Sequence, residues 1–223
     1  MAYGGYLNDE NGNPFYVDGT FPLRLIDVRT FTFNPGAGFF DLYPDDGQMR
    51  FTFVSSTAEG YYFITQDLNN HGTNWILTSI VPNGTVITAY IFGYAVETSL
   101  PEYGLAVWND QGQLVITNET RVLSNLQTLG DRNDDSNSGM NLNVTLAGHW
   151  AVAPTLTGAI VGVIFQGTMP FPFSSFFYAC AAFDGTNTVI RSHGTQGDSS
   201  GGVQNVQITN TREQLVVIDV SRF

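Results

Sequence analysis

Two serines in a glycine-rich segment are the residues best suited to act as nucleophiles. Ser199 and Ser200 follow Asp198 in the sequence GDSSGG of residues 197–202. A serine hydroxyl becomes a nucleophile when a histidine accepts its proton and backbone N–H groups stabilise the oxyanion. The histidines that could act as this base are His71, His149 and His193. The segment is therefore a candidate catalytic loop.

This segment resembles the Gly-Asp-Ser-Gly-Gly nucleophile loop of trypsin-like serine proteases, a family that also fits a two-part β protein of this length. The extra serine, however, would displace the glycine amide that must point at the oxyanion. Neither His71 nor His149 lies in the family's Thr-Ala-Ala-His-Cys segment, and His193 is only a few residues from the serines. A hairpin loop is the favoured interpretation, and we expect no catalytic residues and no enzyme.

Two acidic segments could bind calcium. Residues 131–139 place oxygen-bearing side chains at alternate positions, as calcium loops do, but Leu142 stands at the twelfth position, and the sixth is not glycine. Residues 41–47 are explained as a turn by Pro44 and Gly47. Solvated loops are the favoured interpretation, with calcium as the alternative. The dispersed histidines and single cysteine do not predict a zinc site, so we expect no cofactor.

Aromatic side chains are the remaining candidates for binding. The chain has 10 Tyr, 17 Phe and 3 Trp. The tryptophans that could stack on a sugar ring are Trp75, Trp108 and Trp150. Between Met169 and Phe173, two prolines predict a loop or a sheet edge. The candidate interface residues in and after this segment are Phe171, Phe173, Phe176 and Phe177, and burial in the core is the alternative for them.

The elements that must position these residues are short strands. Alternation such as Arg50-Phe51-Thr52-Phe53 predicts strands with one apolar face, and no segment of 12 or more residues follows a helical period. The expected strands are 23–33, 49–54, 61–66, 75–81, 86–94, 105–108, 114–117, 140–146, 159–165, 176–183, 188–192, 203–209 and 214–220. These short, mostly antiparallel strands predict an all-β fold of the sandwich type.

An internal repeat predicts how the strands divide. Residues 3–23 and 103–123 align without a gap, and each copy has a polar turn that closes on a glycine, Gly12 or Gly112. Each copy is typical of a β-hairpin. The repeat predicts two tandem β-sandwich-like domains, 1–99 and 100–223, with the boundary beside Pro101.

Charge and composition narrow the classes of partner. The net charge is −12, and the chain contains no lysine, so we expect no binding to nucleic acid. Polar residues and prolines interrupt the apolar region 158–183, so we expect no membrane-embedded segment. Because residues 1–5 have neither a basic region nor a long apolar stretch, we expect no signal peptide. Cys180 is the only cysteine and is expected to be a buried, inert thiol.

The repeated hairpin resembles the opening of small accessory tail proteins of bacteriophages. Those proteins often begin Met-x-Tyr-Gly, as Met1-Ala2-Tyr3-Gly4 does, and continue through an Asn/Asp-x-x-Gly turn to a β-rich end similar to residues 214–220. The resemblance covers about 50 of the 223 residues. It implies a structural virion protein at a tail tip, fibre or baseplate, assembled in the host cytoplasm and located in the virion. It also implies contact with other tail proteins and with a glycan or protein of the host surface.

Assembly of this kind implies a homo-oligomer, with a trimer or a hexamer favoured. Two alternatives stay open at the level of the sequence. One is a carbohydrate-binding β-sandwich module that uses the tryptophans, and the other is the trypsin-like protease. We also expect the apolar region 158–183 to take part in self-association or docking, because it combines the strongest hydrophobic run with prolines that suit an edge.

Overall fold

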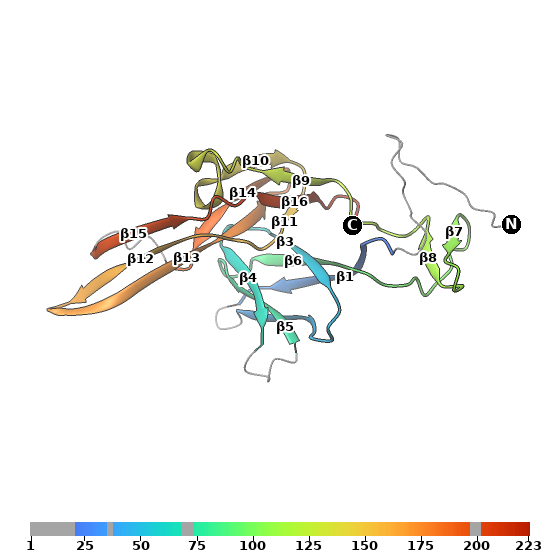
Figure 1. The fold of residues 1–223 in the computed structure, drawn as a ribbon, viewed down its shortest axis with the longest axis horizontal. Coiled ribbons are helices and arrows are strands. Elements are labelled where there is room, and N and C mark those ends of the chain that lie inside the picture. Colours follow the sequence, from blue (N-terminus) through green and yellow to red (C-terminus); the bar gives the residue numbers. More distant parts are fainter. Residues whose placement is uncertain (1–20, 35–37, 68–73, 197–201) are drawn as a thin grey trace. The chain divides into compact units, whose positions relative to one another are not determined.

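The computed structural model describes residues 21–34, 38–67, 74–196 and 202–223, and strands make up most of them (Figure 1). The strands are β1 (Arg24–Thr32), β2 (Phe39–Pro44), β3 (Arg50–Ser56), β4 (Tyr61–Gln66), β5 (Asn74–Ile80), β6 (Val86–Gly93), β7 (Ala106–Trp108), β8 (Leu114–Thr117), β9 (Leu126–Leu129), β10 (Asn143–Ala147), β11 (Trp150–Val152), β12 (Leu156–Gln166), β13 (Met169–Phe183), β14 (Asn187–Gly194), β15 (Val203–Asn210) and β16 (Leu215–Asp219). Two single-turn 3-10 helices, η2 (Asp135–Asn137) and η3 (Gly139–Asn141), are the only helical turns among these residues. The prediction of an all-β fold is confirmed.

The chain forms two compact units, each assembled from several segments. The first comprises residues 1–27, 48–51 and 91–124, and the second comprises residues 28–47, 52–90 and 125–223. The strands β1, β3 and β6 each continue from one unit into the other, so the units are not consecutive stretches of chain. Tandem sandwich-like domains at 1–99 and 100–223 are not confirmed by this arrangement.

The first unit contains the predicted hairpin of the second repeat copy. β7 and β8 pair antiparallel, and Gly112 closes the turn between them with a φ of 73°. Val115 and Ile116 of β8 are buried. Residues 3–20 of the other repeat copy, 3–23, lie outside the described residues, so the repeat itself stays a prediction.

The second unit is built on two sheets. The large sheet has the strand order β10-β14-β13-β3-β11-β16-β9, with β6 and β1 branching from β3, and β12 and β15 branching from β13. The smaller sheet has the order β2-β5-β4. The pairings of β14 with β10 and β13, of β12 with β13 and β15, of β11 with β3 and β16, of β16 with β9, and of β5 with β2 and β4 are antiparallel. β13 pairs parallel with β3, through Ala182 and Ser56.

A buried tyrosine joins the two sheets of this unit. The side chain of Tyr62 on β4 is fully buried, and its hydroxyl accepts a hydrogen bond of 2.6 Å from the N–H of Ala181 on β13. The same hydroxyl donates to the carbonyl of Val54 on β3 at 3.1 Å. Cys180 is buried next to this contact, and its burial raises the thiol pKa, as expected for an inert cysteine.

The sequence analysis does not predict three of the strands, and it predicts a turn where part of one of them lies. β2, β9 and β11 were not expected, and residues 41–44 of a predicted turn lie in β2. In the proline-containing part of β13, Pro170 and Pro172 pair, among the residues that the structure describes, with β12 alone, so the prediction of an edge is confirmed there. The part of the chain that the structure describes contains no helix with the length and hydrophobicity of a membrane span.

Candidate functional site

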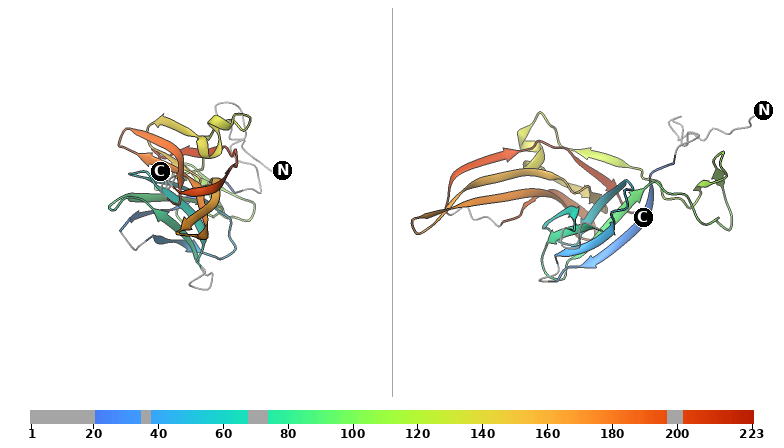
Figure 2. Two further views of the ribbon diagram at one scale, coloured as in Figure 1. Left: turned by 90° about the vertical axis from the view of Figure 1, so that its left-hand side faces the viewer. Right: turned by 60° about the horizontal axis from the view of Figure 1, so that its bottom comes forward.

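Three strands of the second unit form an extended β arm. β12 lies between β13 and β15 and pairs antiparallel with both. β12 and β13 are joined by Gly167 and Thr168, with Gly167 at a φ of 65°. We call residues 158–176 together with β15 the arm. Figures 1 and 2 show its strands continuing together beyond the other strands of this unit.

One face of the arm is apolar. Directly paired residues on neighbouring strands share a face, so Ile160 lies between Ser175 of β13 and Ile208 of β15. In the next such row, Ile164 lies between Phe171 and Val203. The apolar residues therefore extend across all three strands of the arm.

Between these two rows, Gly162 pairs with Phe173. A Cβ at position 162 would stand 2.5 Å from a methyl carbon of Val203, so only glycine lets β15 approach here. The register of β12 with β15 shifts at the same place, between Val161 and Val163. Phe173 is only 8% exposed and belongs to the packed part of the arm.

The arm exposes many large apolar side chains and no charge. No Asp, Glu, Lys, Arg or His occurs in residues 150–183 or 203–211, although the chain as a whole has a net charge of −12. The exposed large hydrophobic residues of the three strands are Leu156, Val161, Phe165, Met169, Phe171, Phe176, Val206 and Ile208. Met169, Phe171, Val206 and Ile208 lie on the face of Ile160, and Val161, Phe165 and Phe176 lie on the other face. Exposed large apolar side chains in such number are typical of interaction sites.

The structure divides the four candidate interface residues. Phe171 and Phe176 are exposed, at 40% and 43%, and point to opposite faces of the arm because they differ by an odd number of positions. Phe173 is buried and Phe177 is half-buried. Only Phe171 and Phe176 are therefore placed to meet a partner without a change in the arm.

The three candidate tryptophans lie on different elements. Trp108 of β7 is 50% exposed. Trp75 is half-buried, and its indole N–H donates to Asp45 at 3.2 Å. Trp150 is half-buried, and its indole N–H donates to the carbonyl of Ala147 at 2.8 Å. Trp108 belongs to the first unit, and Trp75 and Trp150 belong to different sheets of the second.

His149 contacts a serine, Ser55, that the sequence analysis does not identify as a candidate. Its Nε2 lies 2.9 Å from the hydroxyl oxygen of Ser55 on β3, and its ring stacks on Phe183 with centroids 4.1 Å apart. Burial lowers the pKa of His149, while the charge of Asp219 acts in the opposite direction. Ser55 is only 3% exposed, so the pair resembles a buried polar contact more than a catalytic one. Because Ser55 and His149 are far apart in the sequence, no local sequence pattern predicts their contact.

His193 belongs to a different cluster. Arg191 donates to Glu59, and Nε2 of His193 lies 3.6 Å from the same carboxylate. Burial and the charge of Arg191 lower the pKa of His193. Ser199, Ser200 and His71 lie outside the described residues, so the proposed catalytic loop stays untested.

The acidic loop at residues 131–139 is held by its own hydrogen bonds. Asp131 accepts from Asn133, and Asp134 accepts from both the N–H and the hydroxyl of Ser136. These bonds hold the pKa of Asp134 below its ordinary value. Asp135 accepts from Arg212 at 3.0 Å. Within the described part of the chain, no three His, Cys, Asp or Glu residues are grouped to hold a metal ion.

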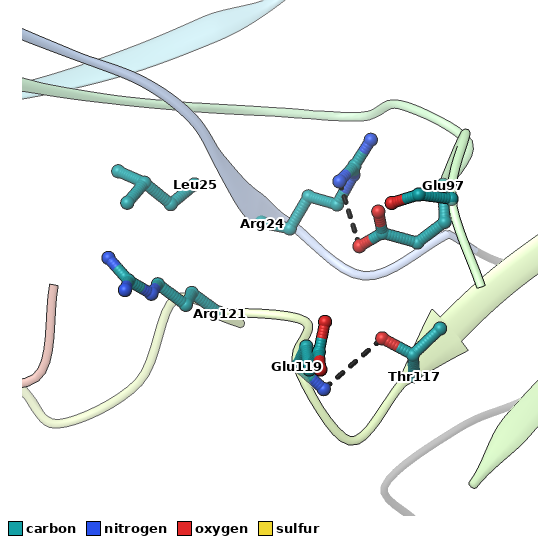
Figure 3. Close-up of a pocket in the computed structure, with 7 residues that line it drawn as sticks. Arg24, Leu25, Glu97, Thr117, Glu119 and Arg121 are labelled. Carbon is teal, nitrogen blue, oxygen red and sulfur yellow. Dashed lines mark hydrogen bonds and ion pairs between the residues drawn. The ribbon is translucent and has the colours of Figure 1, made fainter. Parts of the chain in front are cut away.

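A pocket of about 210 Å³ lies within the first unit (Figure 3). Arg24 forms a 2.8 Å ion pair with Glu97 there and donates to the carbonyls of Ala95 and Val96. Glu97 also accepts from the Thr120 hydroxyl at 2.7 Å. Both charges of the pair are therefore already partnered, which makes this wall of the pocket a structural contact.

Searches of protein-family models, curated proteins and solved structures found no match for this chain.

Proposed function

We propose that this chain is a structural virion protein of a bacteriophage tail, part of a tail tip, fibre or baseplate, whose main role is assembly. The observation that carries the assembly role is the uncharged arm with its exposed large apolar side chains. The tail location rests on the resemblance of residues 1–23 and 103–123 to tail accessory proteins. Attachment to a host receptor is a further part of the proposal.

The arm supports assembly for an energetic reason. Each Å² of apolar surface removed from water contributes about 25 cal/mol before the costs of association are subtracted. Phe165, Met169 and Phe171 are exposed near the turn that joins β12 and β13. Side chains of this size add nothing to the stability of an isolated subunit while they stay in water. A partner that covers them explains why they are there.

The test is the location of the protein after infection. Particles purified by density gradient should contain the chain by mass spectrometry, and antibody labelling in electron micrographs should mark the tail. A double variant, Phe165→Glu with Phe171→Glu, should fold and yet be lost from particles. Its matched control is Ile80→Glu, an exposed apolar residue on β5. Protein present in lysate and never in purified particles would refute the proposal.

Carbohydrate binding is the second candidate, favoured by the exposure of Trp108. Asn109 and Gln113 lie beside it in the β7–β8 hairpin, where the amide of Asn109 donates to Gln113 at 2.8 Å. An indole face flanked by amides suits a sugar ring. A glycan array should then give a signal that Trp108→Ala abolishes and Leu105→Ala keeps. An array without signal would reject this candidate.

A further inference from the structure

We propose that the outer edge of β15 pairs antiparallel with the same strand of a second copy of this chain, across a two-fold axis. The inference rests on the proposed role of the arm in assembly and specifies the partner and the mode of contact. Two copies joined in this way would form one continuous sheet in the order β13-β12-β15-β15-β12-β13.

β15 is an open edge. Within the part of the chain that the structure describes, it pairs with β12 alone. All residues from Gln204 to Thr209 are exposed, and Ile208 is 65% exposed. An edge strand presents unpaired N–H and C=O groups that can accept another strand.

The register identifies a backbone position that faces outward. The N–H of Thr211 donates to the carbonyl of Thr157 at 3.1 Å, which makes these two residues a hydrogen-bonded pair. Bonded and non-bonded pairs alternate along an antiparallel ladder. The pair Ile160–Ile208 is the third after Thr157–Thr211 and is therefore a non-bonded pair. The N–H and C=O of Ile208 therefore point away from β12 and are available to a further strand.

The second half of this edge, from Val206 to Thr209, lacks the usual devices against pairing. Natural edge strands are commonly protected by lysine, other inward-pointing charges or proline, and none of these occurs in residues 203–210. The shift in register beside Gly162 and the positive φ of Asn205, 52°, distort the first half of β15. The regular half, from Val206 to Thr209, is the part that can accept a strand.

Charge selects a second copy as the occupant. Two molecules that each carry a net charge of −12 repel each other, so a close contact between them is favoured at surfaces without acidic residues. A basic partner would instead be recognised by acidic side chains, which the chain has elsewhere and the arm omits. A surface without charge, on a strongly acidic protein, is suited to a partner that is equally acidic.

The side chains also fit an isologous contact. Val206 and Ile208 are exposed and lie on the same side of β15, the side of the apolar face that contains Ile160. A two-fold axis through the regular half of β15 places these residues beside their own symmetry mates. The apolar faces of the two arms then form one surface, and the backbone bonds fix its register.

The first experiment measures the mass of the full chain by light scattering and sedimentation across a range of concentrations. We expect an even number of subunits, the dimer being about 49 kDa, twice the 24.4 kDa of one chain. Ile208→Glu should halve the mass of the assembly without a change in circular dichroism or thermal unfolding. Ile80→Glu, a similarly exposed isoleucine on β5, should leave the mass unchanged.

The second experiment maps the contact without relying on a destabilised variant. Single cysteines are introduced one at a time at positions 206 to 209, since the native Cys180 is buried. Under mild oxidation, cross-linked dimers should form at the positions nearest the axis and not at Ile80→Cys. Cross-linking of identical positions requires that the same strand of both copies meets.

Three results would overturn the inference. They are a monomer at every concentration, an odd-numbered assembly such as a trimer, and an assembly whose mass Ile208→Glu leaves unchanged. The proposed function fails separately, when the chain is missing from purified particles. A protein found in tails that is monomeric in solution would thus refute the strand pairing alone, whereas a β15-linked dimer missing from virions would refute the tail location alone.

Discussion

At the scale of single residues, two contacts between buried or partly buried polar groups involve the histidines. The Ser55–His149 contact and the Glu59–Arg191–His193 cluster were not foreseen, because each joins residues far apart in the sequence. Both histidines have a lowered pKa, with burial as the main cause. Their neutral forms are therefore the ones that the fold favours.

Stability should fall as the pH is lowered through the range just below about 6.5, the ordinary pKa of histidine. Because the folded-state pKa values of His149 and His193 are lowered, the unfolded chain binds more protons than the folded chain in that range. Urea unfolding at pH 7.5 and at lower pH should show the decrease. His149→Gln should be less stable at pH 7.5 but lose less on acidification, and an undiminished loss would contradict this account.

Removing the hydroxyl of Tyr62 should destabilise the second unit. Tyr62→Phe leaves the N–H of Ala181 and the carbonyl of Val54 without the partner that they have now. A buried group left unsatisfied costs about 1–3 kcal/mol, so the free energy of unfolding should fall by that amount. Tyr103→Phe, at an exposed tyrosine, is the control and should have no effect. Equal stability of Tyr62→Phe and the wild type would show that water replaces the hydroxyl.

At the scale of elements, variants at Phe171 and Phe173 distinguish a side chain that packs within the arm from one that contacts a partner. Phe173→Ser should lower the free energy of unfolding by about 3 kcal/mol, because the ring is buried opposite Gly162. Phe171→Ser should leave thermal unfolding unchanged and weaken assembly, because its ring is exposed. Calorimetry and light scattering on both variants distinguish the two roles. If both variants unfold at lower temperature, Phe171 belongs to the core as well.

The strands with clear alternation were predictable, and their partners were not. Tyr61–Gln66 has the predicted bounds, whereas Trp150–Val152 is too short to show a period. The prolines at 170 and 172 correctly indicated an edge. That β15 pairs with β12, across a separation of about 45 residues, depends on long-range packing that local sequence does not encode. For the same reason, the open edge of β15 could be found only in the structure.

At the scale of the whole molecule, the uneven distribution of charge governs association. The acidic residues give the chain a net charge of −12, whereas the arm contains no charged residue. Long-range repulsion between copies and short-range attraction between arms therefore act in opposite directions. Salt changes the first strongly, since the Debye length falls from about 30 Å at 0.01 M to about 10 Å at 0.1 M.

Self-association through the arm should strengthen as salt is added. Raising NaCl from about 0.02 M to about 0.5 M screens the repulsion between copies and leaves the contact between uncharged strands intact. The dissociation constant from sedimentation equilibrium should fall several-fold over this range. A contact built on ion pairs, such as the exposed Arg132–Glu213 pair, would weaken under the same change. A dissociation constant that rises with salt would therefore show that charged residues outside the arm hold the copies together.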